Sequence, residues 1–138
     1  MIRWIALLAG IVGAAGVALG AFAAHGLEAK LLADGFSAEE VAKKLNTCDI
    51  AVRYHLIHAV ALLALSSAPI HWSPMRRSLA ALFFILGLGM FCGILYAQAI
   101  GGLIGLNWVV PIGGLCFIFG WLFVALAALT SQPNESVR

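Results

Sequence analysis

Charged residues are scarce in this sequence. Lys, Arg, Asp and Glu make up 10% of the 138 residues, against about 25% in typical soluble proteins. The net charge of +2 comes from scattered residues, which gives no basic patch of the kind that binds nucleic acid. The three cysteines form no CxxC pair, so they indicate neither a disulfide framework nor a thiolate metal site. A water-soluble domain is therefore not expected.

Apolar residues, by contrast, account for 63% of the chain. They come in blocks of roughly 20, the length that an α-helix needs to cross a hydrocarbon core about 30 Å thick. Strands of a membrane β-barrel would alternate apolar and polar residues, and none of these blocks does. The sequence therefore predicts an all-α integral membrane protein, an antiparallel four-helix bundle that forms a single domain over residues 1–138. The predicted spans are 4–24, 50–69, 79–100 and 109–129.

The N-terminus allows one alternative. Arg3, the apolar run after it and Ala21-Phe22-Ala23 are similar to a signal peptide with its cleavage site, and cleavage would leave three spans. The apolar run is nevertheless longer than the usual signal-peptide core of about 7–15 residues, and it is rich in glycine. We therefore expect a retained first span.

The only long polar connection lies between the first and second spans, at residues 27–49. Ser37 and Glu40 have the spacing of a capping box, and Phe36 and Val41 have that of a hydrophobic staple. This pattern predicts a short amphipathic helix at 38–46 that rests on the bundle or on the membrane interface.

The second connection carries Trp72, Arg76 and Arg77, a combination typical of a membrane interface. Lys and Arg are equally numerous on the two sides of the predicted bundle, so their count does not fix the orientation. Because Arg76 and Arg77 lie in a short loop next to span ends, they favour cytoplasmic termini.

Glycines recur inside the spans at spacings that let another helix approach closely. The first span has a GxxxG pair, the third span repeats this device, and two adjacent glycines follow the start of the fourth. The helix-packing residues expected from these patterns are Gly16, Gly20, Gly89, Gly93, Gly113 and Gly114.

Polar residues gather at one end of the predicted bundle, where the first span ends, the second begins and the third ends. Ionisable groups are costly inside a membrane, so each is a candidate functional residue. The candidates for a polar pocket or ligand-binding site are His25, Arg53, Tyr54, His55, His58, Tyr96 and Gln98. Asn107 maps to the same end, whereas Ser66, Ser67 and Ser78 lie at the opposite one. No catalytic triad is therefore expected, and no catalytic residue is predicted.

Three histidines leave three interpretations open. Tyr54, His55 and His58 are expected to share one face of the second span, while Arg53 points elsewhere and pairs with Asp49 four residues earlier. With His25, the other two histidines could supply three nitrogen ligands to a transition metal or haem. Neutral histidines hydrogen-bonded between helices are the commoner arrangement, and a proton relay through Tyr54, His55 and Tyr96 is a further possibility. We predict no metal and no cofactor.

Three segments resemble a known family: GAFAAHGL at 20–27, AVRYHLIHA at 51–59, and PIGG at 111–114 followed by Gly120-Trp121. Together they resemble domain of unknown function family 423, small four-span membrane proteins of bacteria with mitochondrial relatives in animals. The residues that match the family motifs are His25, Gly26, Arg53, Tyr54, His58, Pro111, Gly113 and Gly114. The resemblance implies a four-helix integral membrane protein and brings no established activity. The 27–49 connection looks longer than the usual one in the family.

We therefore expect a non-enzymatic protein of the bacterial cytoplasmic (inner) membrane. It would be an accessory, assembly or structural component of a membrane complex or a homo-oligomer, in contact with membrane lipids. One alternative is a metal- or haem-binding redox protein that uses His25, His55 and His58. The other is an oligomeric channel or small-solute carrier, because four short spans leave little room for transport by one copy.

Overall fold

The structure, a computed structural model, describes residues 2–69, 71–101 and 105–129. It is all-α, with no strand in these ranges. In chain order the elements are α1 (Ile2–His25), α2 (Leu27–Ala33), α3 (Ala38–Ser66), α4 (Pro74–Gly87), the π-helix η1 (Leu88–Gly93), α5 (Ile94–Gly101) and α6 (Val109–Leu129). Four helical segments are long and apolar enough to cross a membrane: α1, α3, the continuous α4-η1-α5 unit and α6. The predicted all-α membrane bundle is confirmed.

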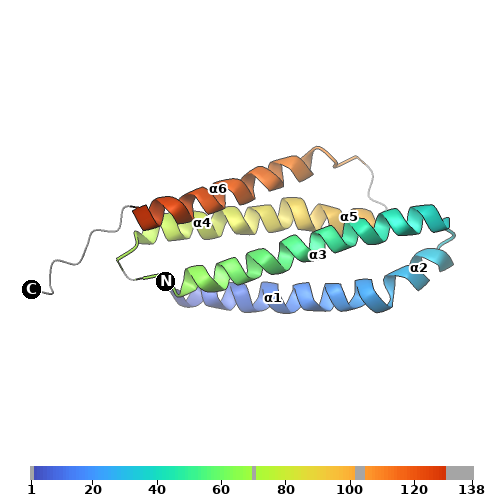
Figure 1. Ribbon diagram of the computed structural model, residues 1–138, viewed down its shortest axis with the longest axis horizontal. Coiled ribbons are helices and arrows are strands. Elements are labelled where there is room, and N and C mark those ends of the chain that lie inside the picture. The colour runs from blue at the N-terminus through green and yellow to red at the C-terminus, as the bar shows by residue number, and fades with distance from the viewer. Residues whose placement is uncertain (1, 70, 102–104, 130–138) are drawn as a thin grey trace, which may run out of the picture.

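The four spans lie side by side in a row (Figure 1). α1 packs along α3, α3 packs on η1 and α5, and α6 packs on α4 and η1. The order across the row is therefore α1, α3, the α4-η1-α5 unit and α6, which places α1 and α6 at its two edges (Figure 1). This arrangement leaves much of both edge helices exposed on the surface of the bundle.

The short helix predicted at 38–46 does not exist as a separate element. The capping box is present, because the Ser37 amide donates to Glu40 Oε2 at 2.9 Å and the Ser37 side chain accepts from the Glu40 amide at 3.4 Å. The helix that starts there then runs without a break to Ser66, since neither glycine nor proline occurs between residues 38 and 66. The short helix of the connection is instead α2, which Gly35, with a φ of +87°, separates from α3.

The second and third spans also have different ends from those predicted. α3 ends at Ser66 rather than 69, and the third span begins at Pro74 rather than 79. Pro74 occupies the first turn of α4, where its missing amide hydrogen costs nothing. Six residues of the third span, Leu88–Gly93, are π-helical, a feature that often marks functional positions.

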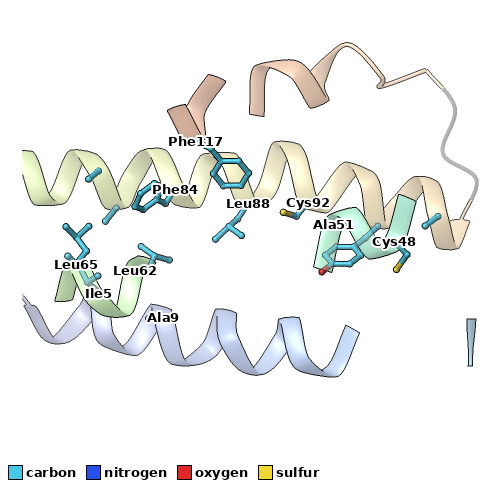
Figure 2. Close-up of a cluster of buried hydrophobic side chains, with 14 of the residues drawn as sticks. Ile5, Ala9, Cys48, Ala51, Leu62, Leu65, Phe84, Leu88, Cys92 and Phe117 are labelled. Carbon is cyan, nitrogen blue, oxygen red and sulfur yellow. The ribbon is translucent and has the colours of Figure 1, made fainter. Parts of the chain in front are cut away.

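The apolar core lies between α1, α3 and the α4-η1-α5 unit. Figure 2 shows Leu62 and Leu65 between the ribbons of α4 and α1, below Phe84 of α4. Leu27 and Leu31 of α2 are fully buried as well. The core therefore extends beyond the spans, to the short helix α2 that follows α1.

The arginine pair of α4 holds the ends of two neighbouring helices. Arg77 donates to the Ala68 carbonyl just after α3, and Arg76 donates to the Leu126 carbonyl in the last turn of α6, both at 3.3 Å. Cationic side chains at helix C-termini satisfy carbonyls that lack an intrahelical partner. Arg77 is buried within the protein, with 6% of its surface exposed.

Candidate functional site

His55 is buried between α3, α1 and α5. Its Nε2 lies 2.9 Å from the Val12 carbonyl oxygen of α1, and its Nδ1 lies 3.2 Å from the Tyr96 hydroxyl of α5. A carbonyl oxygen can only accept, so Nε2 carries a hydrogen and donates it to Val12, and in the neutral form of the ring Nδ1 accepts from the Tyr96 hydroxyl. His55 thus links three helices.

His58 is buried on another side of α3, with 3% of its surface exposed. Its Nδ1 lies 2.7 Å from the Tyr54 carbonyl oxygen, and its Nε2 accepts from the indole N–H of Trp121 at 3.3 Å. An indole N–H can only donate, so His58 is neutral and carries its hydrogen on Nδ1, the opposite tautomer to His55. Its ring stacks on Phe117 of α6, with 3.6 Å between the ring centroids and 14° between the planes.

The three histidines expected at one site are not brought together. Successive helical residues turn by about 100°, so His55 is rotated by that amount from Tyr54 and faces α1 and α5, whereas His58 faces α6. His25 lies exposed at the end of α1. In the described part of the chain, no three His, Cys, Asp or Glu side chains are grouped to hold a metal ion.

The remaining polar candidates form separate contacts. Arg53 is exposed and pairs with Asp49, as its spacing predicts. The Gln98 side-chain amide donates to the Asn107 side chain at 2.6 Å, and the Gln98 backbone carbonyl accepts from Lys44 Nζ at 2.9 Å. Lys44 thereby caps the end of α5, a role that the sequence alone did not indicate.

A hollow of about 400 Å³ lies between α3 and α6 on the lipid-facing side of the row. Six of its lining residues are Tyr54, His58, Phe91, Gly114, Phe117 and Trp121. Tyr54 and Trp121 are both partly exposed at its mouth, and the Tyr54 ring lies 4.7 Å from that of Phe91 in η1. Phe91, Phe117 and Trp121 were not predicted as site residues, although the Gly120-Trp121 pair of the family motif was a signal for Trp121.

Four of the six expected helix-packing glycines fall into two groups. A Cβ atom on Gly113 would lie 2.4 Å from the Phe91 backbone nitrogen, and one on Gly20 would lie 3.2 Å from Val52, so both face a neighbouring helix closely. Gly89 would meet nothing within 4 Å and Gly93 would meet only the backbone of η1, so the expectation that they pack helices together is wrong within one chain.

Close contact between α4 and α6 instead uses two glycines that the sequence analysis did not single out. A Cβ on Gly87 would lie 2.4 Å from the Phe117 ring, and one on Gly120 would lie 2.5 Å from the Phe84 ring. Each helix thus places a phenylalanine over a glycine of the other. The close approach of Phe117 to Gly87 fixes the position of the Phe117 ring, on which His58 stacks.

The arrangement offers few groups for chemistry. Both ring nitrogens of His55 and of His58 are hydrogen-bonded, and the Ser66 hydroxyl donates to the Leu63 carbonyl at 2.6 Å. Every fully buried side-chain nitrogen or oxygen in the described residues has a hydrogen-bond partner. His55 and His58 therefore join neighbouring helices, whereas the Ser66 bond lies within α3.

Known proteins resemble this chain along most of its length. A sequence model of the family described as "Protein of unknown function (DUF423)" matches residues 19–114. A "UPF0382 membrane protein" of Haemophilus influenzae is 34% identical over 116 residues, covering 84% of this chain and 86% of that protein. "UPF0382 membrane protein YwdK" of Bacillus subtilis is 31% identical, with 82% and 85% covered. "UPF0382 inner membrane protein YgdD" of Escherichia coli K12 is 29% identical, with 92% and 90% covered. No solved structure matches significantly.

Proposed function

The chain belongs to the DUF423 family, and we propose that it is a non-enzymatic assembly component of the bacterial cytoplasmic (inner) membrane. It associates through α1 with a second copy of itself or with another protein of a membrane complex. The E. coli relative is named an inner membrane protein, which supports this location. The hydrogen bonds that occupy His55 and His58 support a non-catalytic role.

The observation that carries this proposal is the exposed face of α1. Gly10, Ala14 and Ala18 are exposed and follow one another at intervals of four residues, so they form one stripe on the helix. A Cβ on Gly10 would meet nothing within 4 Å. Small residues at this spacing allow two membrane helices to approach closely, which favours van der Waals packing. Because α1 is an edge of the row, another helix can reach this stripe.

Association through α1 is tested by energy transfer between labelled copies in liposomes, together with identification of proteins that co-purify in mild detergent. Ala14→Ile should abolish the association, because the larger side chain separates the helices. Ala125→Ile is the matched control, since Ala125 is exposed on α6 at the other edge of the row. Equal effects of the two substitutions, or a bare monomer in both assays, would contradict the proposal.

A further inference from the structure

We propose that the hollow between Tyr54 and Trp121 binds a lipid-soluble molecule that has a flat ring head with a hydrogen-bond acceptor and an alkyl or isoprenoid tail. The hollow's volume of about 400 Å³ lies within the roughly 300–1,000 Å³ usual for small-molecule sites. Exposed apolar side chains such as Leu115 and Ile118 surround its mouth, so a ligand would enter from the bilayer.

The lining of the hollow fits a flat ring better than an acyl chain. Tyr54 lies 4.7 Å from Phe91 and 6.2 Å from Phe117, measured between ring centroids, and Trp121 stands beside them on α6. Aromatic faces attract another flat ring through offset stacking, worth about 0.5–1.5 kcal/mol per pair beyond buried area. A saturated chain gains no such contact, so the aromatic lining selects the shape of the head.

Among the described residues, one hydrogen-bond donor at the hollow has no partner. The Tyr54 hydroxyl has no hydrogen-bond partner among the described residues, whereas the neighbouring His58 and Trp121 are bonded to each other. A hydroxyl in an apolar environment gains free energy when it finds an acceptor. A carbonyl or similar oxygen on the ring head would supply that acceptor.

Gly114 supports a ligand site for a separate reason. Its neighbour Gly113 is required for packing, because a Cβ there would lie 2.4 Å from backbone. A Cβ on Gly114 would meet only the Phe91 ring, at 3.8 Å, which is an ordinary contact. Packing therefore explains Gly113 but not Gly114, whose missing side chain keeps the wall of the hollow open.

Space for a tail adjoins the hollow. Two further hollows, of about 470 and 270 Å³, also touch Trp121. Together their linings follow α3 from Leu56 to beyond its end at Ala68, and nearly all of the lining residues are apolar. At about 1.5 Å per residue, this stretch of α3 is about 18 Å long. A tail lying along it would remain in the apolar part of the membrane.

The site is tested by fluorescence in lipid nanodiscs with the full chain. Replacing Trp4, Trp72 and Trp108 with phenylalanine leaves Trp121 as the reporter, because the sequence has four tryptophans. Decylubiquinone, which quenches indole fluorescence, is the probe. We expect saturable quenching. A non-quenching ring ketone of similar size should compete with decylubiquinone for the site. n-Decylbenzene, which has the ring but no acceptor, should compete at least tenfold less well than this ketone.

Three variants in this background place the site. Gly114→Leu fills the hollow and should weaken the affinity at least tenfold, whereas Gly89→Leu, at an open glycine away from it, should change nothing. Tyr54→Phe should weaken the affinity about threefold to tenfold, the usual effect of one hydrogen bond. If circular dichroism and gel filtration find Gly114→Leu misfolded, Tyr54→Phe decides. If quenching rises linearly with the quinone concentration in every variant, the quinone only partitions into the lipid, and the proposal is overturned. Unchanged affinity in the folded Gly114→Leu and Tyr54→Phe variants would overturn it as well.

Discussion

The imidazole of His55 occupies space that a side chain on Gly16 would otherwise fill. A Cβ atom on Gly16 would lie 3.2 Å from Cδ2 of His55. Since the ring donates to the Val12 carbonyl, one turn earlier on α1, it must cross the surface of α1 at Gly16 to reach its acceptor. The absence of a side chain at Gly16 therefore allows the His55 hydrogen bond that joins α1 to α3.

Substitution of Gly16 should weaken this joint. Gly16→Val would place atoms against the His55 ring and against Leu56, whose Cδ2 would lie 2.9 Å from the new Cβ. Overpacking of this kind typically costs about 1–3 kcal/mol. The loss should appear in SDS-induced unfolding in mixed micelles, followed by circular dichroism. Gly13→Val makes the same change on the same helix outside the exposed stripe, where a Cβ would meet only Ala59 Cβ, at 3.9 Å, so equal stabilities for the two variants would contradict this account.

Adjacent glycines on α6 should respond differently to alanine. In Gly113→Ala the new methyl group would meet the backbone of η1, which cannot rotate away, so we expect a loss of about 2–3 kcal/mol. Gly114→Ala adds a methyl group in ordinary contact with Phe91 and should change the stability by less than about 0.5 kcal/mol. The same unfolding assay compares the two proteins. A larger loss for Gly114→Ala would show that α6 is rotated relative to η1.

The architecture could be predicted from the sequence because hydrophobic length alone identifies a membrane span. The four spans and the capping box at Ser37 follow from local patterns, and the structure has both. The prediction of a separate helix at 38–46 was wrong, because a capping signal marks where a helix starts and does not say where the helix ends.

The candidate site could be predicted only in part, because its geometry depends on which neighbour each helix face meets. Tyr54, His55 and His58 lie within five residues, yet the row arrangement gives His55 to α1 and α5, and His58 to α6. The sequence of α3 alone does not show which of its faces meets α1 and α5 and which meets α6. Trp121 and Phe117 become part of the site only through contacts across 59 or more residues of chain.

The two buried histidines should be neutral and in opposite tautomers. The Val12 carbonyl requires a hydrogen on Nε2 of His55, and the Trp121 indole requires a bare Nε2 on His58. Solid-state NMR of ¹⁵N-histidine-labelled protein in bilayers at pH 7 distinguishes these forms, with single histidine variants for assignment. Tyr96→Phe should leave the tautomer of His55 unchanged, because the Val12 carbonyl still fixes it. Imidazolium signals from these residues, or one shared tautomer, would rule out the assignment.

Metal or haem binding by the three histidines should not occur in the isolated protein. His55 and His58 face different helices, and a ligating nitrogen on either ring would first have to give up a hydrogen bond to Val12, Tyr96, Tyr54 or Trp121. His25 is exposed at the end of α1, so His25→Ala should leave the stability within about 0.5 kcal/mol of the wild type. We expect elemental analysis to find substoichiometric metal and absorption spectra to contain no Soret band. A stoichiometric metal or haem that is lost in both His55→Ala and His25→Ala would restore the redox alternative, because only shared coordination links these two distant positions.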